Sequence, residues 1–193
     1  MSFIQIPRKF LELKAGTKFI DVLVYAAIDF QKDSTTYKSR IGMRTIADKY
    51  SIALSKVEAA ISRLKKNGYL DYTQIKSDTN EYVFNEYTLP KPKDFLMLDP
   101  QLLVEDLKPK DKGVLIYLQL IAEEGINDIA QTTIEGIANS IGITRQTMSK
   151  YLKYFVDNGH ITKGKHFYKC HYLANKPKQP DTSITYDLFI LDY

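Results

Sequence analysis

Residues 137–161 read IANSIGITRQTMSKYLKYFVDNGHI, and residues 46–70 read IADKYSIALSKVEAAISRLKKNGYL. The two stretches align over 25 residues without a gap, with five identical residues and apolar residues matched at six further positions. Self-similarity of this kind indicates that one structural unit occurs twice in the chain. We therefore predict two copies of one fold, each of roughly 80–90 residues.

The repeat extends upstream and sets the expected boundaries. Residues 22–25 (VLVY) match residues 114–117 (VLIY), and Phe3-Ile4 matches Phe95-Leu96. The segment PKPK at residues 90–93 is expected to be a short, stiff linker, because proline fixes the backbone. We predict a first domain over residues 1–89, a linker over 90–93, a second domain over 94–175 and a C-terminal tail over 176–193.

Each copy shows the same order of expected elements. Apolar residues recur every three or four positions where helices are expected, and Asn-Gly pairs end the third helix of each copy. Runs rich in Tyr, Val, Phe and Ile around turn-forming residues predict a hairpin after that helix. The expected elements are a first helix (18–30 and 111–124), a short second helix (43–50 and 133–141), a third helix (54–66 and 145–157) and two strands (69–76 with 81–89, and 160–163 with 166–173).

Helix, helix–turn–helix and hairpin is the element order of a winged helix-turn-helix, and residues 137–152 (I-A-x-x-x-G-I-T-R-Q-T-M-S-K-Y-L) resemble that superfamily. The resemblance covers nearly the whole chain. It implies an α+β fold of two tandem winged helix-turn-helix domains, each with three helices and a β-hairpin wing, arranged as an internal pseudo-dimer. It also implies that the third helix of a copy enters the major groove of DNA.

A helix that reads DNA must bury one face and present another. The third helix of each copy carries one apolar stripe, which we expect to face the core. The stripes consist of Val57, Ala60, Ile61 and Leu64 in the first copy, and of Met148, Tyr151, Leu152 and Phe155 in the second.

The opposite face of the second copy's third helix carries residue types that read a DNA groove. Arginine pairs with guanine and glutamine with adenine, while lysine and serine reach bases or phosphates. Thr144 is the expected N-cap of this helix, and lysines of the wing are expected to contact the DNA backbone. We assign DNA contacts in this copy to Thr144, Arg145, Gln146, Thr147, Ser149, Lys150, Lys153, Lys163, Lys165 and Lys169.

The first copy is less suited to reading bases. Leu54 stands at the position of Arg145, and Glu58 would meet the negative field of the phosphates. A protein-contacting role is therefore the alternative for this copy. The DNA contacts expected here are Arg44, Ser55, Lys56, Ala59, Ser62, Arg63 and Lys66.

Charge and composition agree with a nucleic-acid partner. The net charge is +4, and the positive charge gathers in residues 43–70 (+4) and 137–173 (+5). The N-terminus lacks the pattern of a secretion signal, the longest apolar run is too short to cross a bilayer, and Cys170 is the only cysteine. We therefore expect a cytoplasmic protein that does not contact membranes.

Signals for an enzyme or a metal site are weak. His160, His166, Cys170 and His171 lie close together but lack the paired C-x₂-C spacing of zinc sites. The sequence has no nucleotide-binding glycine loop, no G-x-S-x-G and no clustered carboxylates. We expect no enzyme activity, no metal and no cofactor.

Tandem winged helices resemble three groups of proteins: DNA-binding accessory and regulatory proteins of Gram-positive conjugative plasmids (TraN type), plasmid replication initiators, and chromosome-segregation proteins that contact other proteins. We favour a sequence-specific duplex DNA-binding protein of a mobile element, acting as a transcriptional regulator or a conjugative-transfer accessory factor. Replication initiation and protein interaction are the alternatives. We expect a monomer with an internal pseudo-two-fold, two half-sites about one helical turn apart, and further partners in a plasmid transfer or replication complex.

Overall fold

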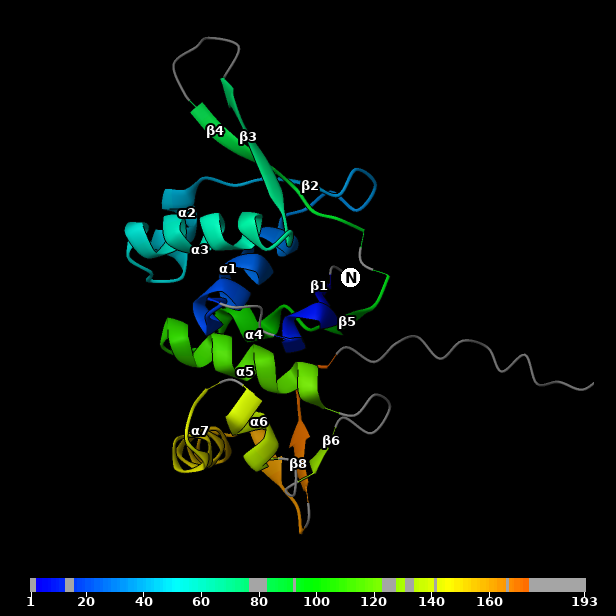
Figure 1. The fold of residues 1–193 in the computed structure, drawn as a ribbon, viewed down its shortest axis with the longest axis vertical. Coiled ribbons are helices and arrows are strands. Elements are labelled where there is room, and N and C mark those ends of the chain that lie inside the picture. Colours follow the sequence, from blue (N-terminus) through cyan, green and yellow to red (C-terminus); the bar gives the residue numbers. More distant parts are fainter. Residues whose placement is uncertain are drawn as a thin grey trace, which may run out of the picture.

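The computed structural model describes residues 3–12, 16–76, 83–91, 93–122, 128–130, 134–140, 142–165 and 167–173. Within these residues the fold is mixed α+β, with helices and small antiparallel sheets, which is compatible with the winged-helix expectation. The molecule is elongated, and the two halves of the chain occupy its two ends (Figure 1). The predicted tail, Pro92 of the predicted linker and His166 lie outside the described residues.

Both halves contain the same elements in the same order: a strand, a short helix, a longer helix, a strand, two helices and two strands. The first half contains β1 (Ile4–Pro7), η1 (Arg8–Glu12), α1 (Phe19–Phe30), β2 (Lys38–Arg40), α2 (Met43–Lys49), α3 (Leu54–Lys66), β3 (Asp71–Lys76) and β4 (Val83–Thr88). The second half contains β5 (Phe95–Leu98), α4 (Gln101–Val104), α5 (Pro109–Ile121), β6 (Asp128–Ala130), α6 (Ile134–Ser140), α7 (Arg145–Asp157), β7 (Ile161–Lys163) and β8 (Phe167–Cys170).

Each half contains a three-stranded antiparallel sheet, and the two sheets have the same topology. The strand order is β2-β4-β3 in the first half and β6-β8-β7 in the second, with antiparallel pairs throughout. The third helices, α3 and α7, have the bounds that the sequence predicts. Gly68 and Gly159 directly follow the C-cap residues of α3 and α7. Their φ angles are +70° and +75°, a conformation that glycine adopts without strain.

The expectation of three helices and a two-stranded wing was incomplete. Each wing sheet gains a third strand, β2 or β6, and each half begins with a strand and a short helix. These strands have three or four residues, too few to show a period-two pattern. These short strands are stable because a partner strand forms hydrogen bonds with their backbone N–H and C=O groups. The first helix of the second half also starts earlier than predicted, at Pro109, because proline is favoured in the first helical turn.

The two halves meet through β1 and β5, which form an antiparallel pair between them (Figure 1). Ile4 pairs with Leu98, Gln5 with Met97 and Ile6 with Leu96. The repeat places Ile4 in register with Leu96, and a shift of the same 92 residues relates Gln5 to Met97. The pairing is therefore symmetric about Gln5 and Met97, as in the strand pair of a two-fold dimer.

Helices α1 and α5 pack against each other beside this strand pair, and most of their residues are buried. Gly113 of α5 permits a close approach, because a Cβ atom there would lie 2.1 Å from the backbone oxygen of Phe19. The buried apolar side chains of both halves form one continuous cluster. The structure thus adds a shared core to the two predicted units, and their division into separate domains stays a prediction.

Candidate nucleic-acid interface

Helix α7 has the two faces that the sequence predicts. Met148, Leu152 and Phe155 are fully buried, and Tyr151 is half-buried. The hydroxyl of Thr144 accepts a hydrogen bond from the backbone N–H of Thr147 at 3.1 Å, so the predicted N-cap is confirmed. These contacts fix the helix by its apolar stripe and its first turn, and leave the opposite face to the solvent.

The polar face of α7 is open. Arg145 is 72% exposed and approaches Glu135 of α6 at 3.6 Å, while Lys153 forms an exposed ion pair with Asp157 at 2.7 Å. Exposed ion pairs of this kind contribute little stability, so both cations are available to another partner. All the α7 residues assigned to DNA contact are exposed: Thr144, Arg145, Gln146, Thr147, Ser149, Lys150 and Lys153.

The wing of the second half presents three more of the assigned residues. Lys163 of β7, Lys165 of the turn and Lys169 of β8 are all exposed, and Lys163 and Lys169 come from the two paired strands of the hairpin. Phe167 at the start of β8 is also 37% exposed. This hairpin therefore exposes three lysines and one aromatic ring.

Helix α3 also buries its predicted stripe of Val57, Ala60, Ile61 and Leu64. Its N-cap is Ala53, whose side chain offers no hydrogen bond to the helix. The assigned residues of this half that lie exposed are Arg44 of α2 and Ser55, Lys56, Ala59, Ser62 and Lys66 of α3.

Arg63 is held within the fold. Its Nε and Nη2 donate to the two carboxylate oxygens of Asp21 in α1, at 2.8 and 2.6 Å. The Asp21 side chain is fully buried, and the hydrogen bond from Arg63 to it raises the pKa of Arg63. A buried carboxylate without a cation would be strongly destabilising, so this guanidinium anchors α3 to α1. The pairing was absent from the sequence-based assignment of Arg63.

Three lysines that the sequence reasoning missed lie beside these helices. Lys18, Lys108 and Lys110 precede or begin α1 and α5, and all three are exposed. Together with Ser55, Lys56 and other residues they line a hollow of about 680 Å³ next to α3. The sequence signal for these residues was a short run of lysines before an apolar helix. Their position next to α3 could not be predicted from it, because that position depends on the packing of α1 on α5.

Lys108 connects the surfaces next to the two third helices. It lines the hollow beside α3 and also a second one of about 350 Å³, formed with Thr147, Lys150 and Tyr154 of α7. Both helices lie on the left-hand side of the molecule in Figure 1. Lys108, just before the start of α5, thus lies between the hollows beside α3 and α7.

The histidines near Cys170 form structural contacts. His160 Nδ1 lies 2.9 Å from the hydroxyl of Tyr172, and His171 contacts Thr162 and the backbone oxygen of Gly159. Burial, with a smaller effect of Glu105, raises the pKa of Tyr172. Among the described residues, no group of three or more His, Cys, Asp and Glu side chains is arranged to hold a metal ion.

Comparisons with known proteins do not assign the chain to a family. No protein-family model and no curated protein matches the chain. A solved structure titled "Nse1-Nse3-Nse4 complex" is similar over 80% of this chain and 68% of its own, with 10% identity and a TM-score of 0.30, a likeness that carries no inference. The resemblance to plasmid proteins therefore stays a prediction. In the described part of the chain, no helix has the length and apolar character needed to span a bilayer.

Proposed function

We propose that this chain is a sequence-specific duplex DNA-binding protein, and not an enzyme, in which two tandem winged helix-turn-helix units present α3 and α7 to one DNA molecule. The observation that carries the proposal is that both helices bury an apolar stripe and expose a polar face, and that Lys108 lines the hollows beside both of them. Since the major groove admits one α-helix, two such helices on one side of a protein suit two half-sites of a duplex.

The chemistry of the exposed residues supports this use. Arg145 and Gln146 at the start of α7 are suited to bidentate contacts with guanine and adenine. The lysines of the second wing, and Lys108 between the helices, are suited to phosphate contacts, which position a protein without reading sequence. Such contacts release counterions, so the affinity must fall steeply with salt.

The test is selection of bound duplexes from random DNA with the full chain, followed by footprinting and a salt series. We expect a defined site and an affinity that falls by roughly 10³–10⁵ between 50 and 200 mM salt if about ten phosphates are contacted. Arg145→Ala should relax the base preference, and Lys163→Ala should weaken binding to all sequences alike. Failure to bind any duplex at 50 mM salt would refute the proposal.

We further propose that this DNA belongs to a mobile element, where the protein acts as a transcriptional regulator or a conjugative-transfer accessory factor. This part depends on the resemblance of tandem winged helices to DNA-binding proteins of conjugative plasmids and to plasmid replication initiators. Replication initiation is the alternative. Mapping the selected site onto the element distinguishes them, because an initiator requires repeated copies of the site at an origin, and a regulator requires a site at a promoter.

A protein-contacting role for the first half is a second candidate. The hollow beside α3 is lined by the apolar residues Phe19, Ile20, Ile52 and Pro109 as well as by lysines, and apolar patches at a surface mark protein contacts. The substitution Ala59→Arg adds a cation to the exposed face of α3. A change in the duplex affinity of this variant would show that the exposed face of α3 contacts DNA. An unchanged affinity would favour a protein partner for this face.

A further inference from the structure

The contacts between the halves are symmetric at the centre of the molecule. The β1–β5 register is symmetric about Gln5 and Met97, α1 packs against the equivalent helix α5, and the wing sheets have equivalent strand orders. Helices α3 and α7 are therefore equivalent elements on the two sides of this centre, although α3 packs closely on α1 and α7 makes few contacts with α5. On DNA, a two-fold arrangement of recognition helices corresponds to inverted half-sites.

The exposed faces of these two equivalent helices are chemically different. At six equivalent outward positions, α7 has three cations, an amide and two hydroxyls, whereas α3 has one cation and one carboxylate. The first of these positions differs in burial too, since Arg145 is 72% exposed while Leu54 packs partly buried against the core. The equivalent pairs are Arg145 and Leu54, Gln146 and Ser55, Thr147 and Lys56, Ser149 and Glu58, Lys150 and Ala59, and Lys153 and Ser62.

The arginine that α3 does carry is engaged elsewhere. Arg63 makes its bidentate pair with the buried Asp21, and the positions equivalent to these two residues in the second half are Tyr154 and Gly113. Tyr154 is 40% exposed and lines the hollow beside α7. The residue at this position of the third helix is therefore at the surface in the second half. In the first half, the equivalent Arg63 attaches α3 to α1.

From this asymmetry we infer that the protein binds an inverted site in one orientation only. Helix α7 reads the bases of one half-site, and α3 holds the backbone of the other through Lys56 and Lys66 without reading its sequence. This inference rests on the proposed function, and it adds that the bound protein distinguishes one end of its site from the other.

The first test measures each half-site separately with the unmodified chain. In the selected duplex, base pairs are replaced first under one half of the footprint and then under the other. We expect each replacement in the α7 half-site to weaken binding about ten-fold, and replacements in the α3 half-site to change it less than two-fold. Equal losses in both half-sites would overturn the inference and leave the proposed function standing. Absence of duplex binding at 50 mM salt would instead remove the proposed function.

The orientation is tested with a DNA-cleaving iron chelate on the second wing. Cys170 is the only cysteine of the sequence and is buried, so the substitution Lys165→Cys supplies one accessible attachment point. Lys165 is exposed in the wing. We expect strand cuts at one end of the footprint. Cuts of equal strength at both ends would show two orientations and overturn the inference.

A gain-of-function variant completes the test. The double substitution Leu54→Arg/Ser55→Gln gives α3 the first two outward residues of α7. We expect this variant to become sensitive to base changes in the α3 half-site, approaching the ten-fold losses of the other half. Lys56→Gln is the matched control, because it should weaken binding to all sequences without creating a base preference. A base preference that is already present in the α3 half-site before the substitution would contradict the inference.

Discussion

Gly113 of α5 packs against the backbone carbonyl of Phe19 in α1, and a Cβ atom at residue 113 would come within 2.1 Å of that oxygen. The starts of α1 and α5 can approach this closely because residue 113 has no side chain. The same approach gathers Lys18, Lys108 and Lys110 around the hollow beside α3. A single small residue in the core thereby shapes the proposed DNA-binding surface.

The substitution Gly113→Ala should lower the free energy of unfolding by about 1–3 kcal/mol, because the backbone at Phe19 must shift to admit the methyl group. Urea denaturation measures this loss. Gly136→Ala in α6 is the matched control, since nothing lies within 4 Å of its Cβ position. That variant should gain roughly 0.5–1 kcal/mol from the helix propensity of alanine. Equal stability of the two variants would contradict the close contact.

The substitution Arg63→Ala should lower the unfolding free energy by about 3 kcal/mol or more, because it leaves the buried carboxylate of Asp21 without its cation. Lys153→Ala, which removes a partner from the exposed pair with Asp157, should cost less than about 1 kcal/mol. In a double-mutant cycle, Asp21→Leu/Arg63→Met should lose less than the sum of the single changes. Additive losses would show that the pair is not coupled.

Stability should decrease with acidification through Glu86. This buried side chain accepts hydrogen bonds from Lys38 and Arg40, which hold the pKa of Glu86 below its ordinary value. The stability that this group contributes is therefore present above pH ~4.3, the ordinary glutamate pKa, and is lost as the pH falls through the lowered pKa. Urea midpoints across this range should fall less steeply for Glu86→Gln. A slope equal to that of the unmodified protein would refute the assignment.

The caps of the two third helices predict opposite effects of substitution. Thr144→Ala removes the hydroxyl that accepts from the Thr147 N–H and should cost about 1 kcal/mol. Ala53→Thr places a hydroxyl at the uncapped start of α3 and should add stability of the same order. Thermal unfolding of both variants measures the two shifts, which should differ in sign.

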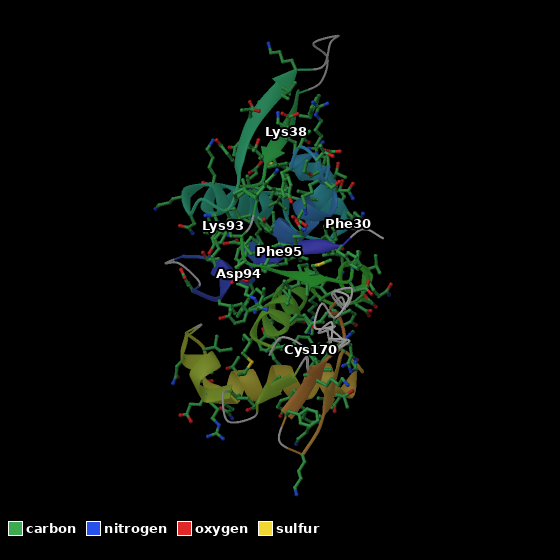
Figure 2. The ribbon with its side chains drawn as sticks, turned by 90° about the vertical axis from the view of Figure 1, so that its right-hand side faces the viewer. Phe30, Lys38, Lys93, Asp94, Phe95 and Cys170 are labelled. Carbon is green, nitrogen blue, oxygen red and sulfur yellow. The ribbon has the colours of Figure 1, made fainter. Side chains whose placement is uncertain are left out.

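The substitution Lys108→Ala should weaken duplex binding and reduce the slope of log affinity against log salt by about one. Lys93→Ala is the matched control. Lys93, labelled in Figure 2, is also exposed, but it lies between β4 and β5 and lines neither the hollow beside α3 nor the one beside α7. This variant should keep the affinity and slope of the unmodified chain. A similar loss from both substitutions would indicate an effect of net charge alone.

The features that sequence reasoning predicted well depend on neighbouring residues. The bounds of α3 and α7, their buried stripes, the Thr144 cap and the glycines that follow both helices are all local patterns within about fifteen residues. The strands β1 and β5 were missed, because four-residue segments carry no periodic signal and are stable only when paired. The Arg63–Asp21 pair was missed because 42 residues separate its partners.

The sequence by itself determined that one helical and β-hairpin unit occurs twice, and which face of each third helix is polar, because periodicity and capping are short-range properties of the chain. The tertiary structure decided how the units are joined and which cations remain at the surface. It pairs β1 with β5, whose paired residues lie 88 to 94 positions apart in the chain, brings Lys108 between the hollows beside α3 and α7, and directs Arg63 towards the buried Asp21. Those outcomes follow from burying apolar faces and compensating a buried charge, which depend on contacts between distant parts of the chain.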